Sequence, residues 1–156
     1  MRTKLPGYSS LRKGRCSIRR HVYHVTWVTA GRKPLFENLH AARLLIRSLR
    51  FADQSRWSQT LAYVLMPDHL HWLFELRGGK TLSGVMASIK RYSATRLARA
   101  PGIAGPIWQK GFHDHAARGD EDLVKLSRYI VANPIRAGLC THVGDYPHWD
   151  AIWMGL

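Results

Sequence analysis

The chain has 156 residues and a mass of 17.8 kDa, which is the size of a single domain. Hydrophobic residues make up 46% of it, which excludes a disordered or collagen-like chain, and its two cysteines are too few for a disulfide-rich secreted protein. The net charge of +14 favours a polyanionic partner such as nucleic acid. With no apolar run that could span a membrane and no signal peptide, we expect a cytoplasmic protein that does not bind membranes.

The first half of the chain predicts a strand, a helix and a hairpin after a basic arm. Segments rich in β-branched and aromatic residues are typical of strands, and an Asn before an amphipathic stretch is typical of a helix N-cap. Pro67-Asp68 makes a tight connection between two such strands. The predicted elements are the arm at 1–20, a strand at 21–29, a helix from Asn38 to about residue 54, and hairpin strands at 58–66 and 69–76.

The second half predicts helix, strand, helix and a tail. The last helix should end near Asn133, because the residue before Pro134 avoids helical backbone angles. The predicted elements are a helix capped by Thr81 or Ser83 and running to about residue 99, a strand at 107–116, a helix opening at Gly119-Asp120, and a tail at 134–156. The order β-α-β-β-α-β with an added C-terminal helix predicts a single α+β domain, residues 1–156, with a ferredoxin-like sheet.

The positive charge is unevenly distributed. Residues 1–56 contain thirteen Lys and Arg against two acids, and residues 76–113 contain seven and no acid. Because a merely soluble surface intersperses both signs, these stretches favour a surface that follows phosphates, although a solvated basic exterior is the alternative. The candidate DNA contacts are Lys13, Arg15, Arg19 and Arg20 before the first strand, Lys90, Arg91 and Arg96 on the second helix, and His115.

Two histidines on a predicted strand form the sharpest local motif. His69 and His71 flank Leu70, so both imidazoles project from the same face of the strand. Such a pair can bind a metal ion, or it can be two hydrogen-bonded histidines at a sheet surface. A second pattern, His113-Asp114-His115, lies in a more polar segment and belongs to the site, to the structure or to a DNA contact. Either pair needs a third ligand from elsewhere.

The last helix offers a hydroxyl and an amide on one face. Tyr129 and Asn133 are four residues apart beside an apolar stripe, so the Tyr129 hydroxyl can stay accessible while its ring packs. The carbonyl oxygen of Asn133 suits Mg²⁺ or Mn²⁺ as a third ligand. Tyr92, flanked by basic residues on the second helix, is a rival hydroxyl. Spacing alone does not decide between the two tyrosines.

Four segments together resemble one known family. The chain is similar to the REP-associated tyrosine transposases, bacterial relatives of the single-tyrosine HUH transposases. The likeness spans nearly the whole chain in the right order. Its segments are LRKGR followed by VTWVTAGRKPLF, then YVLMPDHLHWLFEL, then IWQKGFHDHAARGDEDLVKLSRYIVANPIRAGL, and finally DYPHWDAIW.

The resemblance implies a specific chemistry. Family members are ferredoxin-like domains that bind and cut single-stranded DNA at repetitive extragenic palindromes folded as hairpins. The family motif falls on His69, Leu70 and His71, its nucleophile on Tyr129, and its third metal ligand on Asn133. The implied reaction uses Mg²⁺ or Mn²⁺, forms a 5′-phosphotyrosine intermediate and needs no nucleotide cofactor. By the same match Tyr92 is not the nucleophile. We expect the protein to be associated with the nucleoid in the cytoplasm.

Two other functions are compatible with the same composition. A domesticated relative could hold DNA hairpins without cutting them, but the presence of Tyr129, His69 and His71 favours the enzyme. An RNA-binding ferredoxin-like domain needs aromatic residues where the histidines stand. We expect a monomer in which the Tyr129 helix packs on its own sheet, with a dimer as the alternative.

Overall fold

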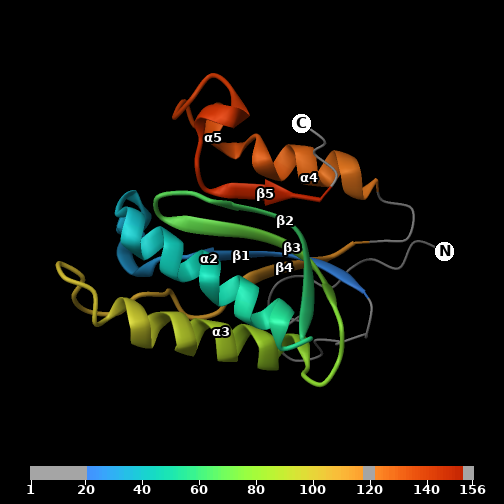
Figure 1. The fold of residues 1–156 in the computed structure, drawn as a ribbon, viewed down its shortest axis with the longest axis horizontal. Coiled ribbons are helices and arrows are strands. Elements are labelled where there is room, and N and C mark those ends of the chain that lie inside the picture. The colour runs from blue at the N-terminus through green and yellow to red at the C-terminus, as the bar shows by residue number, and fades with distance from the viewer. Residues whose placement is uncertain (1–20, 118–121, 153–156) are drawn as a thin grey trace.

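The computed structural model describes residues 21–117 and 122–152 as three layers (Figure 1). A five-stranded antiparallel sheet forms the middle layer, with α2 and α3 on one face and α4 on the other. Among the described residues no helix is long and apolar enough to cross a membrane. The predicted DNA contacts Lys13, Arg15, Arg19 and Arg20 lie outside the described residues.

The sheet confirms the predicted ferredoxin-like topology. Its strand order is β4-β1-β3-β2-β5, and every neighbouring pair is antiparallel. The first four strands in this order are the four that the sequence predicts, whereas β5 is an addition that pairs with the free edge of β2. The strands are β1 (Val22–Val28), β2 (Ser58–Leu65), β3 (His69–Leu76), β4 (His113–Ala116) and β5 (Trp149–Ala151).

One face of the sheet forms the main hydrophobic core. Alternate residues of β1, namely Tyr23, Val25 and Trp27, are buried against α2 (Leu39–Gln54) and α3 (Leu82–Leu97). Burial of each large apolar side chain contributes roughly 1.5–3 kcal/mol. Both helices start at predicted caps, because Asn38 accepts a hydrogen bond from Ala41 N, and Thr81 accepts one from Gly84 N.

The opposite face is covered by α4 (Leu123–Val131), which packs on β2 and β5. Ile130 and Val131 of α4 are buried against Leu73 of β3 and its neighbours on β2. Because side chains alternate along a strand, His69 and His71 point to the same face as Leu73. The helix that carries Tyr129 therefore lies on the sheet face that carries the histidine pair.

One predicted boundary is wrong, and one short helix was not predicted. The predicted strand at 107–116 is a strand only from His113, because Trp108 makes an isolated bridge to Thr29 and Gly111, at φ +74°, turns the chain before β4 begins. The last helix, α4, ends at Val131, two residues before the predicted end near Asn133, and after a turn at Ala132 the chain forms α5 (Asn133–Arg136), which was not predicted. Pro134 does not prevent this short helix, because a proline in the first turn of a helix loses no hydrogen bond.

Candidate active site

The turn between β2 and β3 places a carboxylate beside the first histidine. Asp68 Oδ1 lies 2.6 Å from His69 Nδ1, and Asp68 Oδ2 lies 3.1 Å from Nη1 of Arg32. Thr29 N donates to the Asp68 carbonyl at 2.9 Å and fixes the turn. Burial raises the pKa of Asp68, but the hydrogen bond to His69 and the charge of Arg32 outweigh burial, so the net pKa is below its ordinary value. Asp68 is therefore an ionised acceptor that orients the His69 ring.

The second histidine is held from β1. His71 Nδ1 lies 3.0 Å from His24 Nε2 and 3.1 Å from Thr26 Oγ1. Burial, together with the charges of His24, His69 and Arg136, lowers the pKa of His71 to about 3. At neutral pH the ring is uncharged, so it keeps a lone pair for a metal ion.

Both rings are held through the same nitrogen. Asp68 contacts Nδ1 of His69, while His24 and Thr26 contact Nδ1 of His71. Within residues 21–117 and 122–152 no hydrogen bond from the protein reaches Nε2 of either ring. The ring centroids are 5.1 Å apart. Two oriented imidazoles whose Nε2 atoms accept no hydrogen bond from the described residues fit the donor set that a divalent ion such as Mn²⁺ or Mg²⁺ needs from histidine.

Tyr129 is the most exposed large hydrophobic side chain of α4. The residue as a whole is 60% exposed. A cation covers one side of its ring, because Arg136 Cζ lies 3.9 Å from the ring centroid. Nη2 of Arg136 also donates to the Tyr129 carbonyl at 2.7 Å. The phenol is thus accessible, while its ring is fixed by a contact across the α4–α5 turn.

Asn133 begins α5, one residue beyond that turn. Its Nδ2 donates to the Ile130 carbonyl at 2.9 Å, which leaves Oδ1 as an acceptor. Asn133 follows Ile130 and Val131, which are buried against Leu73 on the sheet face that carries the histidine pair. The described part of the chain contains no group of three His, Cys, Asp or Glu side chains that could hold a metal ion. Within this part of the chain a third ligand would be of another type, and the Asn133 amide oxygen fits that need.

Tyr92, the rival hydroxyl, lies in the opposite layer. It is on α3, which covers the sheet face away from the histidines. Its ring stacks on Phe51 with centroids 4.8 Å apart, and Arg96 Cζ lies 3.4 Å from its centroid. Phe51, Tyr92 and Arg96 thus form a stack on the surface of α2 and α3. The sheet separates this stack from His69 and His71.

The other predicted basic contacts differ in their surroundings. Lys90 is half-buried and donates to the carbonyls of Gln109, at 3.2 Å, and Gly111. Burial lowers the pKa of Lys90 to about 8. This lysine therefore fastens the segment before β4 to α3, whereas Arg91 is exposed.

The second histidine pattern faces the same side as the first. In the β1–β4 register His115 pairs with His24, and His113 pairs with Thr26. Directly paired residues of antiparallel strands project from one face, so this face carries histidines from β4, β1 and β3 in succession. His115 is half-buried there.

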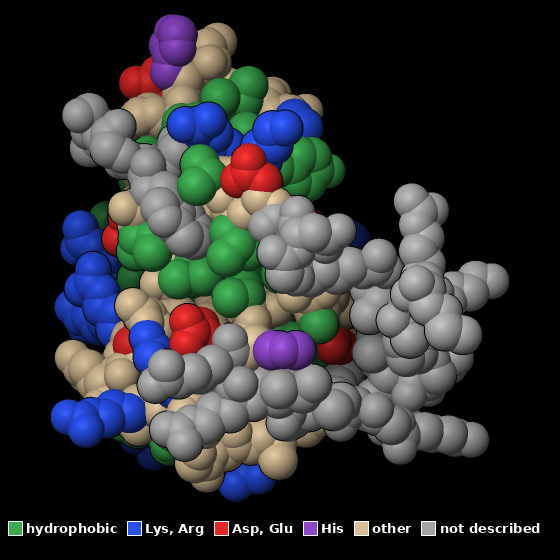
Figure 2. Space-filling view, turned by 90° about the vertical axis from the view of Figure 1, so that its right-hand side faces the viewer, with side chains coloured by type: hydrophobic (Ala, Val, Ile, Leu, Met, Phe, Trp, Pro, Cys, Tyr) green, Lys and Arg blue, Asp and Glu red, His purple; other side chains and the backbone are tan. Residues whose placement is uncertain are grey.

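Charge and shape mark other surfaces. Figure 2 shows that Lys and Arg side chains gather along one edge of the view and near the top, while Asp and Glu are scattered among other side chains. Arg43, Arg47 and Arg50, which the sequence analysis did not single out, are exposed along α2, and no described carboxylate forms an ion pair with them.

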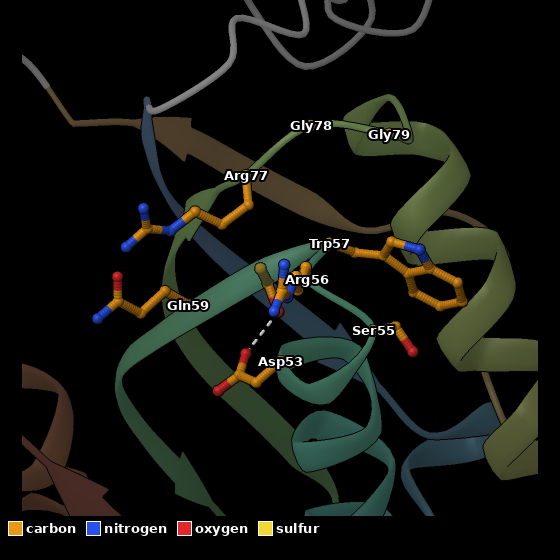
Figure 3. A pocket seen from close by; sticks show the side chains of 9 residues that line it. Asp53, Ser55, Arg56, Trp57, Gln59, Arg77, Gly78 and Gly79 are labelled. Atoms are coloured by element: carbon orange, nitrogen blue, oxygen red, sulfur yellow. Dashed lines mark hydrogen bonds between the residues drawn. The ribbon is translucent and has the colours of Figure 1, made fainter.

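A cavity of about 720 Å³, lined by Trp57, Arg77 and neighbouring residues, opens at the far end of β3 from His69 (Figure 3). It is separate from the histidine pair.

Sequence reasoning missed four residues that shape this site. His24 and Thr26 were visible as the polar positions of an alternating strand, and Asp68 as the turn residue before His69. The sequence carried no signal for Arg136, because its contact with Tyr129 depends on the turn between α4 and α5.

Known proteins resemble this chain in both sequence and fold. A provisionally named REP-associated tyrosine transposase from Haemophilus influenzae is 28% identical over 100 residues, which cover 58% of this chain and 57% of that protein. The REP-associated tyrosine transposase of Escherichia coli is 32% identical over 87 residues, which cover 55% of this chain and 50% of that protein. The chain thus matches about half the length of these curated relatives, and the predicted resemblance is confirmed.

Solved structures confirm the fold. A REP-associated tyrosine transposase bound to a REP hairpin superimposes with a TM-score of 0.74 at 23% identity, covering 87% of this chain and 79% of that chain. A provisionally assigned transposase from Deinococcus radiodurans gives a TM-score of 0.54 at 21% identity, covering 75% of this chain and 93% of that chain. At these identities the likeness is evidence of fold alone.

A family model covers the site itself. The model for IS200-like transposases matches residues 17–133, a span that includes strands β1 to β4, the histidine pair and the helix of Tyr129. With that match over most of its length, the chain belongs to the IS200-like transposase family.

Proposed function

We propose that the chain cuts and rejoins single-stranded DNA at REP-type hairpins, with Tyr129 as the nucleophile. The observation that carries the proposal is the pair of histidines held through Nδ1, on the sheet face where the Tyr129 helix packs, with no hydrogen bond from any described residue to either Nε2 atom. Membership of the transposase family supports a DNA-processing enzyme, and REP-associated tyrosine transposases are among its relatives.

His69, His71 and Asn133 are the residues that would hold a divalent ion. The free Nε2 atoms and the free Oδ1 of Asn133 supply two nitrogens and one oxygen, and three protein ligands leave positions open for a substrate oxygen. When bound, Mg²⁺ or Mn²⁺ neutralises charge on the scissile phosphate. Asp68, His24 and Thr26 keep the two rings oriented.

The chemistry then follows from the tyrosine. Tyr129 Oη loses its proton to solvent and attacks phosphorus in line. The new bond joins Tyr129 to the 5′-phosphate, while the bond to the 3′-oxygen breaks and that oxygen leaves as a hydroxyl group. Because a phosphoester replaces a phosphoester, a second 3′-hydroxyl can reverse the step and join strands. The exposure of the Tyr129 side chain allows a DNA strand to approach it.

The DNA surface extends beyond this centre. Arg91 and Arg96 are exposed on α3, His115 lies on the histidine face, and Arg43, Arg47 and Arg50 add a row along α2. Guanidinium groups bind phosphates through paired hydrogen bonds. Because α4 packs on the sheet of its own chain, we propose that a monomer cuts with its own Tyr129.

A cleavage assay tests the proposal. End-labelled single-stranded hairpins from the repeats of the host genome are incubated with Mn²⁺ or Mg²⁺ and resolved under denaturing conditions. Wild type and Tyr129→Phe are compared with the matched control Tyr92→Phe and with His71→Gln. We expect a covalent protein–DNA adduct that Tyr129→Phe and His71→Gln lose and Tyr92→Phe keeps. Tight hairpin binding with no adduct for any hairpin or metal would instead identify a binding protein without cutting activity.

A further inference from the structure

Arg136 makes two contacts with Tyr129 that together define the position of the tyrosine. The guanidinium carbon lies 3.9 Å from the ring centroid, and Nη2 donates to the Tyr129 backbone carbonyl at 2.7 Å. The stack restricts rotation of the ring, and the hydrogen bond ties the end of α5 to the last turn of α4. One side chain therefore fixes both the ring and the backbone of the tyrosine.

The same guanidinium keeps most of its hydrogen-bond donors for a partner other than Tyr129. A guanidinium has five N–H donors in a planar fork, and the structure uses one of them in a hydrogen bond to the protein. Among the described residues, the remaining donors are left available to an anionic group beside Tyr129. No carboxylate among the described residues forms an ion pair with Arg136.

We propose that Arg136 is a positioning residue that holds the Tyr129 ring for attack on a phosphate bound beside His71. This inference rests on the proposed function for its catalytic part, and on the stack and the hydrogen bond for its structural part. Planarity is central to it: a lysine at this position keeps the charge but cannot stack as a flat group while it donates to the carbonyl.

The structural part can be measured without DNA. 3-Fluorotyrosine is incorporated at position 129, and the ¹⁹F resonance is compared in wild type, Arg136→Gln, Arg136→Lys and the control Arg128→Gln. Arg128 is exposed on α4, the helix of Tyr129, and has no stacking contact with the Tyr129 ring among the described contacts. Its replacement by Gln removes the same positive charge as Arg136→Gln. We expect the resonance to move toward its value in the unfolded protein in both Arg136 variants and to stay in place in Arg128→Gln. An unmoved resonance in Arg136→Gln would overturn the inference.

The catalytic part of the inference is tested by measuring DNA binding and the rate of reaction separately. Hairpin affinity and the single-turnover rate of adduct formation are measured for the same proteins. We expect the rate to fall more than about tenfold in Arg136→Gln, with affinity changed less than about threefold, because misplacing a reacting group costs rate rather than binding. Arg136→Lys should react as slowly as Arg136→Gln. Full rescue by lysine would show that charge alone matters and would refute positioning.

The two proposals fail in different ways. If wild type forms no adduct with any hairpin, the proposed function fails, and the ¹⁹F measurement alone decides whether Arg136 holds Tyr129. If wild type forms the adduct and Arg136→Gln forms it at the same rate, the proposed function stands and the positioning role is wrong. Thermal unfolding of each variant identifies a change caused by loss of folding.

Discussion

Replacement of Asp68 by Asn tests whether the carboxylate prepares His69 to bind a metal ion. The change keeps the size of the side chain and removes its charge, so the 2.6 Å hydrogen bond to His69 Nδ1 loses its ionic character. Bonds to charged groups contribute about 1.5–3 kcal/mol and neutral ones about 0.5–1.5 kcal/mol, so the difference is about 1–1.5 kcal/mol. The loss of such an outer partner weakens metal binding by about 10- to 100-fold.

The surroundings of the pair favour the lower end of that range. The side chains of His69 and Asp68 are 21% and 25% exposed, so water partly screens their interaction. We therefore expect Mn²⁺ affinity to fall about tenfold in Asp68→Asn. Arg32→Gln removes a partner whose side chain is 63% exposed, and this variant should lose less than about threefold.

The assay is a calorimetric titration of Mn²⁺ into DNA-free protein, with the site variant His69→Ala as the reference for complete loss. Asp145→Asn serves as the matched control, because Asp145 is exposed in the C-terminal segment. Unfolding in urea confirms that each variant is folded. Wild-type Mn²⁺ affinity in Asp68→Asn, with binding lost in His69→Ala, would refute the idea that Asp68 tunes the site.

Three further predictions concern stability. Burial lowers the pKa of His71 to about 3, below its value in the unfolded chain, so the unfolded state binds more protons between those values and stability falls as pH drops. Between pH 7.5 and 5 this residue should cost at most about 2 kcal/mol, and urea unfolding in chelator should show a flatter pH dependence for His71→Gln; equal slopes would contradict the reasoning. Tyr146→Phe removes a hydrogen bond to the Leu65 carbonyl and should lower the free energy of unfolding by about 1 kcal/mol; no change in urea midpoint would count against that bond. Asn38→Ala removes the cap of α2 and should cost about 1 kcal/mol, with Asn38→Gly costing clearly less; equal losses would argue against capping.

The elements with strong local patterns were predictable. Alternation along β1 and the tight turn at Pro67-Asp68 gave the strand and the hairpin, because burial on one face requires that alternation. The three residues of β5 carry no period that can be read, and pairing with the edge of β2 alone makes them a strand. The break of the last helix at Ala132 was hidden because proline is tolerated in the first turn of the helix that follows.

The candidate site was predictable where it depends on local spacing, and not where it depends on tertiary contacts. The shared face of His69 and His71 follows from their spacing, whereas the bond from His24 to His71 depends on the register between β1 and β3. Register and the packing of α4 are properties of the whole fold, so the partners of both histidines and of Tyr129 emerged only in three dimensions. The roles of Tyr129 and Asn133, and the extent of the domain, stay predictions.

Strand β1 serves two layers at once, since Tyr23, Val25 and Trp27 enter the main core while His24 and Thr26 face the histidine pair. A point substitution can alter one set and spare the other. The insertion or deletion of one residue cannot spare either set, because a shift of one residue exchanges the two faces along the rest of the strand. Natural variation in this strand should therefore be confined to substitutions, and inactive relatives that remain folded should arise by replacement of His24 or Thr26 rather than by a change in the length of β1.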